Sequence, residues 1–216
     1  MASPSWTIDD LLSRPRLRPY LAASAGDAEQ ALRLYEWNSS ISGAFYESLH
    51  YVEIGLRNAM DRRLADWSRR RQTNLPWYLD PQVRLTPSTR QKVAVARMSA
   101  TRGRRVEVHG KVIAELSFGF WWSLLAAEYN RRLWQPCLHA AFEGPVRRGI
   151  LHSELNELRL LRNRIAHHEP IHLQDLAGAY RRVLDVAGRI SPLLRVRIES
   201  TTRVPTVLSG RPLPPS

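Results

Sequence analysis

Residues 150–170 read ILHSELNELRLLRNRIAHHEP and combine an apolar helical stripe with a cluster of polar groups at its end. Apolar side chains recur there at steps of three and four residues, which predicts a helix over residues 146–168 that Pro170 ends. They are Ile150, Leu151, Leu155, Leu158, Leu161 and Ile165. At 100° per residue, Arg162 falls inside this stripe, where a guanidinium is costly unless it is paired or faces a polar cleft. The stretch therefore indicates a site at the end of a helix.

A purely structural interpretation of the same residues is also open. Arginines near helix ends are usually solvated, and histidines in a last helical turn are favoured by the helix dipole alone. Under that interpretation Arg162, His167 and His168 stabilise the helix end and bind no ligand.

The spacing of Arg162, Asn163 and His167 resembles the arginine–polar–histidine signature of the HEPN superfamily. More narrowly, LRNRIAHHEPI at residues 161–171 is similar to its Abi-like (abortive infection) branch. A lone arginine and histidine at this spacing would be a weak signal, because the pair arises by chance in arginine-rich helices.

Three further blocks carry the same resemblance. LYEWN at residues 34–38 and EIGLRNA at residues 53–59 resemble the first long helix of Abi-like proteins. GKVIAELSFGFW at residues 110–121 is similar to the start of their central helix. The blocks keep the family's order and span roughly residues 30–190, which makes the resemblance fairly specific.

The resemblance implies an all-α fold, a HEPN-like helical bundle. It further implies a metal-independent RNA endonuclease that needs no cofactor and acts as a toxin or phage-defence (abortive infection) effector. The family's composite sites imply a homodimer, and an antitoxin is a candidate partner. The alternative is a non-catalytic helical module that binds RNA or a protein.

The motif residues suit RNA cleavage on chemical grounds as well. RNA supplies its own nucleophile, the 2′-OH, so the protein needs only a proton acceptor, charge stabilisation and positioning. His167 is the best acid or base, and Arg162 can fork onto phosphate oxygens. Asn163 could orient either group or the ribose, and His168 and Glu169 are candidate helpers.

On a straight helix Arg162 and His167 point about 140° apart. Two accounts stay open. The break at Pro170 could unwind the last turn and bring His167 back, or a twofold dimer could build each site from two chains.

Glu53, Arg57 and Asn58 lie together in the first long helix. Glu53 and Arg57 are spaced as a surface ion pair, but they also adjoin an apolar stripe and could face the motif helix instead. We include all three as supporting site residues.

The chain has 216 residues and a net charge of +12, and only Lys92 and Lys111 among its 32 basic residues are lysines. Arginine's planar fork suits phosphate, so RNA is a reasonable partner, although arginine bias can also reflect a GC-rich genome.

A disulfide, a metal and a membrane are not expected. Cys137 is the only cysteine, and the adjacent His167 and His168 diverge on a helix and lack the spacing of zinc hydrolases. Residues 1–10 do not resemble a signal peptide, and no run of about 20 apolar residues could cross a bilayer. We therefore expect a cytoplasmic protein.

The positions of proline and glycine, which end helices and favour turns, predict the organisation of the chain. An irregular lead-in (residues 1–27) precedes the HEPN-like domain (28–199), and a disordered proline-rich tail (200–216) follows it. Helices are expected within the domain. Their ranges are 28–70, 87–100, 111–129, 130–142 (with a break at Pro136), 146–168 and 173–190.

Overall fold

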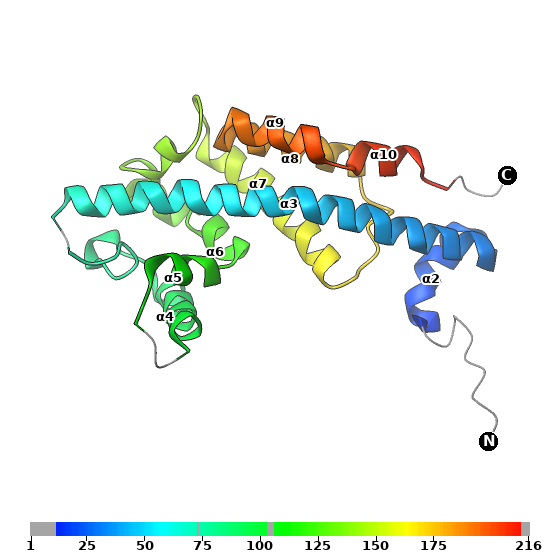
Figure 1. Cartoon of the computed structure of the whole chain (residues 1–216), viewed down its shortest axis with the longest axis horizontal. Coiled ribbons are helices and arrows are strands. Elements are labelled where there is room, and N and C mark those ends of the chain that lie inside the picture. The colour runs from blue at the N-terminus through cyan, green and yellow to red at the C-terminus, as the bar shows by residue number, and fades with distance from the viewer. Residues whose placement is uncertain (1–11, 73, 103–105, 213–216) are drawn as a thin grey trace, which may run out of the picture.

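The computed structural model describes residues 12–72, 74–102 and 106–212, and these ranges contain helices and no β-strand (Figure 1). The prediction of an all-α fold is therefore confirmed. None of the helices in the described ranges has the length and apolar character needed to cross a membrane.

One helix, α3 (Ala28–Arg70), runs along the whole molecule and is the scaffold for the rest (Figure 1). Its 43 residues span about 65 Å at 1.5 Å per residue. Asp27 caps its first turn, because the carboxylate accepts a hydrogen bond from the Gln30 backbone N–H at 3.0 Å. One apolar stripe stays buried along most of its length. It includes Ile41, Phe45, Leu49, Val52, Leu56, Met60 and Leu64.

The C-terminal half of the chain packs against α3. α7 (Arg148–Ala166), α8 (Leu176–Ile190) and α9 (Pro192–Thr201) all contact α3. α7 and α8 are antiparallel, since the ion pairs Glu154–Arg189 and Glu157–Arg182 join successive positions in opposite order. This layer holds the motif helix against the scaffold.

The segment 109–142 differs from its prediction. One helix is expected over residues 111–129, but α5 (His109–Glu115) and α6 (Phe118–Ser123) are separate. Leu116 is extended (ψ 116°), and the Ser117 hydroxyl then accepts from the Phe120 N–H, which starts a new helix. The 3-10 turn η2 (Ala127–Tyr129) follows.

No single helix spans residues 130–142 either. A π-helical turn, η3 (Asn130–Trp134), is followed by a 3-10 turn, η4 (Leu138–Ala141). Pro136 lies between them and has no N–H to continue a helix, so the predicted break is confirmed. By contrast, α4 (Pro87–Thr101) starts at its predicted proline, with Thr86 as its cap.

The prediction of an irregular lead-in is wrong from residue 14 on. α2 (Arg14–Ala23) forms there, with Pro15 in the first turn, where a missing N–H leaves no intrahelical bond unmade. Leu17 and Tyr20 bury themselves as α2 packs on α3. Residues 1–11 lie outside the described residues.

The prediction of a disordered tail is also wrong for most of residues 200–216. α9 continues to Thr201, and α10 (Val204–Ser209) packs back on α3. The Trp37 indole N–H donates to the Val207 carbonyl oxygen at 2.7 Å. The folded unit therefore exceeds the predicted domain at both ends, and residues 213–216 lie outside the described residues.

Candidate functional site

The apolar stripe of α7 is buried as predicted, which fixes the orientation of the motif. Ile150 is the exception at 47% exposed. The buried members are Leu151, Leu155, Leu158, Leu161 and Ile165. Arg162 therefore lies at the border of a packed face, as its position in the stripe predicts.

The helix ends at Ala166, two residues before the predicted end. The N–H of His168 donates to the Ile165 carbonyl (3.0 Å), and the N–H of Glu169 donates to the Arg164 carbonyl (2.8 Å). These two bonds form a Schellman motif, which requires a left-handed residue at the position of His168. His168 has φ 55°, where glycine is usual. A terminating role thus accounts for the backbone of His168.

Arg162 faces Glu53 of α3. Arg162 Nε lies 3.7 Å from Glu53 Oε2, and the side chains are 33% and 25% exposed. Arg162 Nε is itself buried and has no hydrogen-bond partner among the described residues. The other oxygen, Glu53 Oε1, accepts a hydrogen bond from the Phe118 N–H of α6 at 3.2 Å. Glu53 thus joins α3, α6 and α7 at the motif.

Of the two interpretations open for Glu53, the structure shows the one that faces the motif helix. Arg57 does not pair with it. The Arg57 Nε donates instead to its neighbour, Asn58 Oδ1, at 3.4 Å, and Asn58 is exposed. No described contact links Arg57 or Asn58 to Arg162 or His167.

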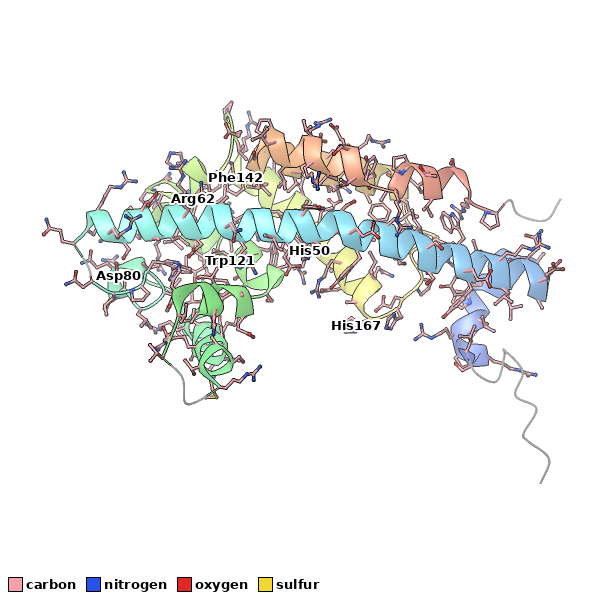
Figure 2. All side chains as sticks on the ribbon, in the orientation of Figure 1. His50, Arg62, Asp80, Trp121, Phe142 and His167 are labelled. Atoms are coloured by element: carbon pink, nitrogen blue, oxygen red, sulfur yellow. The ribbon has the colours of Figure 1, made fainter. Side chains whose placement is uncertain are left out.

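The structure does not bring Arg162 and His167 together. His167 is exposed, and its imidazole has no hydrogen-bond partner among the described residues (Figure 2). Its backbone N–H still donates to the Asn163 carbonyl at 3.0 Å, so His167 continues the helical path and the separation of about 140° stands. The unwound-turn account is therefore wrong. Asn163, whose side chain is half-buried, lies between the two.

A cavity of about 410 Å³ adjoins the motif end, between α2, α3 and the residues that follow α7. Arg16 Nη1 donates to the His168 carbonyl at 2.7 Å across it. Asn38 Oδ1 accepts the N–H groups of Ile171 and His172, at 2.8 and 3.1 Å, and so holds the chain after Pro170. His168 and Glu169 therefore border a polar hollow as well as solvent.

Sequence reasoning missed the part of this cavity that α2 supplies, because residues 1–27 are predicted to be irregular. The available signal is Pro15 at a helix start, followed by Leu17 and Tyr20 three residues apart. Burial raises the pKa of the Tyr20 phenol to about 12, with a smaller contribution from Tyr35.

The described residues contain no group of three or more His, Cys, Asp or Glu side chains placed to hold a metal ion. Comparison of the chain with known protein families, with curated proteins and with solved structures finds no match.

Proposed function

We propose that this chain is an RNA endonuclease of the Abi-like HEPN type that uses no metal ion. The observation that carries the proposal is the exposed imidazole of His167, which has no hydrogen-bond partner among the described residues and lies at the C-cap of the helix that bears Arg162. Imidazole changes charge near neutral pH, and a guanidinium matches the geometry of a phosphate. The net charge of +12 favours a polyanionic substrate.

The reaction follows from these two groups. His167 takes the proton of a ribose 2′-OH, the 2′ oxygen bonds to phosphorus, and the bond from phosphorus to O5′ breaks. The departing O5′ takes a proton from water or from a second imidazole, for which His168 is the candidate. Arg162 stabilises the charge that grows on the non-bridging oxygens. The products are a 2′,3′-cyclic phosphate and a 5′-hydroxyl.

Two site residues serve position rather than proton transfer. Glu53 holds Arg162 against α3, and Asn163 can orient the ribose or the scissile phosphate. Because Arg162 and His167 diverge within a chain, we propose a twofold homodimer in which each site takes Arg162 from one protomer and His167 from its partner.

End mapping of cleaved RNA tests this chemistry. The full chain is incubated with RNA in excess EDTA, and the product ends are identified by enzymatic labelling. We expect cleavage to persist, with 5′-hydroxyl and cyclic phosphate ends. Cleavage that needs a divalent ion, or that leaves 5′-phosphates, would falsify the mechanism.

The family resemblance further supports a biological role as a toxin or phage-defence effector, with an antitoxin as a candidate partner. Expression in a bacterial host should then slow growth, and His167→Ala should restore it. Equal growth with and without His167 would contradict that role.

A second function has its own supporting observation. Arg162 already has a carboxylate neighbour in Glu53, which suits a structural arginine in a module that binds RNA or protein without cutting it. RNA that binds but stays intact with the wild-type chain would favour this alternative.

A further inference from the structure

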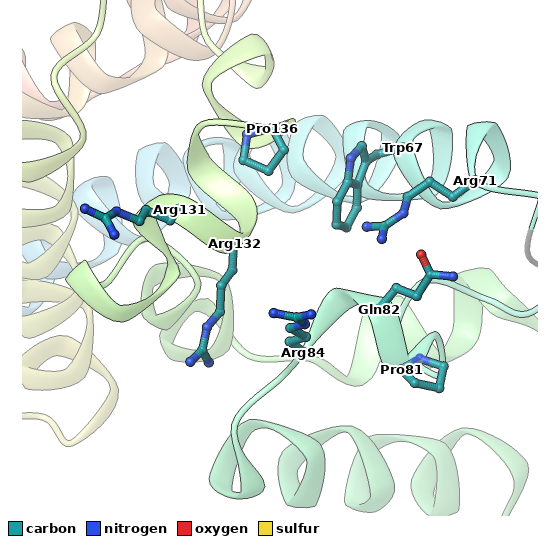
Figure 3. A pocket seen from close by; sticks show the side chains of 8 residues that line it. All are labelled: Trp67, Arg71, Pro81, Gln82, Arg84, Arg131, Arg132 and Pro136. Atoms are coloured by element: carbon teal, nitrogen blue, oxygen red, sulfur yellow. The ribbon is translucent and has the colours of Figure 1, made fainter.

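A pocket of about 720 Å³ lies at the C-terminal end of α3, away from the motif (Figure 3). α3, the 3-10 turn η1 (Pro81–Val83) and the π-helical η3 enclose it. Four arginines line it, and none of the described lining residues is acidic. The polar and aromatic members are Trp67, Arg71, Gln82, Arg84, Arg131 and Arg132.

Arg71 is fixed in place by an aromatic ring. Its guanidinium carbon lies 4.4 Å from the ring centroid of Trp67, one turn earlier in α3. A guanidinium stacked in this way keeps its N–H edges free, so it loses little side-chain freedom when it binds an anion. In Figure 3 the head of Arg71 points toward the space in front of Arg84.

Arg84 occupies a conformation that arginine rarely adopts. It follows η1 with φ 52° and ψ 47°, in the left-handed region. Its N–H donates to the Pro81 carbonyl oxygen at 3.2 Å, so this conformation ends η1. The guanidinium lies in the pocket opposite Arg71 (Figure 3).

Nearby carboxylates are engaged elsewhere. Asp66 pairs with Arg69. Asp80 is buried and accepts hydrogen bonds from the Ser68 hydroxyl (2.9 Å) and the Gln82 N–H (2.8 Å). No described carboxylate forms an ion pair with Arg71, Arg84 or Arg132, so their charges stay available to a ligand.

We propose that this arginine pocket binds the backbone phosphates of single-stranded RNA, as a second contact for the RNA that the motif cleaves. The inference rests on the proposed function for its substrate. Two preorganised forks and a third arginine, Arg132, suit phosphate oxygens better than a protein carboxylate surface, because a phosphodiester chain presents an anion at every nucleotide. Arg131 points away from the others and is not required (Figure 3).

The pocket and the motif lie on one scaffold. From Glu53, which contacts Arg162, to Trp67 is fourteen residues of α3, or about 21 Å along the helix. Figure 2 shows His167 and Asp80 well separated along α3. An RNA that reaches both places must therefore be several nucleotides long.

The test measures binding separately from cleavage. The probe is a fluorescent 2′-O-methyl RNA, which cannot be cut by 2′-OH attack, in lengths of about 16 and about 4 nucleotides. Binding to the full chain is followed by anisotropy against salt. The variant is Arg71→Gln with Arg84→Asn, since asparagine tolerates the left-handed region. The charge-matched control replaces the exposed Arg181 and Arg197 with Gln.

We expect the pocket variant to bind the longer RNA at least about tenfold more weakly at low salt. The slope of the logarithm of the binding constant against the logarithm of the salt concentration should become smaller in magnitude by about 1.4, since two charges are removed. The control should bind like the wild type, and Arg71→Lys should keep the slope while losing affinity. An unchanged slope in the pocket variant, with its thermal unfolding unaltered, overturns the proposal.

Two further outcomes distinguish RNA from free phosphate as the ligand, and the pocket proposal from the nuclease proposal. If Arg71→Gln with Arg84→Asn weakens the binding of inorganic phosphate but leaves RNA binding unchanged, the pocket is a site for the free anion and the RNA contact is wrong. If the wild type never cleaves RNA but binding still depends on Arg71 and Arg84, the proposed nuclease fails and the pocket stands.

Discussion

The arginines around α7 and the arginines of the pocket at the C-terminal end of α3 have different partners. Beside α7, arginines meet carboxylates that tie neighbouring helices together. The pairs are Arg162–Glu53, Arg182–Glu157 and Arg189–Glu154. In the arginine pocket, Arg71 stacks on the Trp67 ring and Arg84 has a left-handed backbone. Neither forms an ion pair with a carboxylate among the described residues. Net charge therefore does not distinguish the arginines that pair with carboxylates from those whose charge has no carboxylate partner among the described residues.

Arg162 is the intermediate case. Its contact with Glu53 is 3.7 Å, looser than the 2.8 Å of Arg182 with Glu157, and its Nε makes no hydrogen bond. A loose pair can both position a guanidinium and yield to a stronger anion, which is the behaviour that the proposed chemistry requires.

The largest expected effect is on RNA cleavage. His167→Ala removes the proposed proton acceptor, and Arg162→Ala removes the charge proposed to contact the phosphate. Each should lower the cleavage rate by at least about 100-fold. Arg181→Gln is the control, because Arg181 is exposed on α8 and lies outside the motif. A loss in Arg181→Gln as large as in Arg162→Ala would show that general positive charge, and not the position of Arg162, sets the rate.

Loss of Glu53 tests whether the pair at the motif is structural. Glu53→Ala leaves the half-buried Arg162 without its carboxylate and the Phe118 N–H without an acceptor. The free energy of unfolding in urea should fall by about 1–2 kcal/mol, the partial exposure of both side chains limiting the cost. Arg57→Ala should change it by less than about 0.5 kcal/mol.

His172 predicts a pH dependence. Burial, with Arg211 as the smaller cause, holds the pKa of His172 below its ordinary 6.5. A base with a lower pKa in the folded chain contributes stability that is present above the unfolded pKa and is lost as the pH falls below it. The free energy of unfolding should thus drop as the solution is acidified through the ordinary pKa of 6.5.

The matched variant is His172→Phe, which keeps the ring contact with Tyr20 (4.8 Å between centroids). It removes two buried nitrogens that have no hydrogen-bond partner in the part of the chain that the structure describes. It should reduce this drop, leaving the part due to His152, whose pKa burial also lowers. The exposed His50→Gln should retain the full drop. A pH dependence equal in His172→Phe and the wild type would contradict this assignment.

The smallest effect separates the two adjacent histidines. His168 has φ 55°, so His168→Gly should raise the free energy of unfolding by about 0.5–1 kcal/mol. His167→Gly, at a C-cap with φ −93°, should not raise it. Thermal melts of the two variants decide this, and destabilisation by His168→Gly would show that its side chain matters more than its backbone.

Local signals predicted much of the fold. The bounds of α3 follow from helical periodicity in a segment without proline, and the start of α4 follows from Pro87. The prediction for residues 109–142 is wrong because an apolar, aromatic run reads as one helix and hides the local N-cap at Ser117, while the π-helical turn depends on packing. Short-range patterns do not encode such packing.

The two candidate sites also differ in how far the sequence predicts them. The motif residues are neighbours in sequence, so the spacing of Arg162 and His167 was enough to identify them as candidates. Glu53 was identified as a candidate from its place beside an apolar stripe. The arginine pocket joins residues 67–71, 82–84 and 131–132, which only the fold brings together. Nothing in the sequence near Arg84 predicts its left-handed backbone.

Subunit mixing tests the central claim most directly. Arg162→Ala and His167→Ala chains, each inactive alone, are mixed in equal amounts, allowed to exchange, and assayed for RNA cleavage in EDTA. Random pairing makes half of the dimers mixed, each with one intact site of two, so activity should recover to about a quarter of wild type. A mixture as inactive as its parents, beside an active wild type, would contradict the composite site.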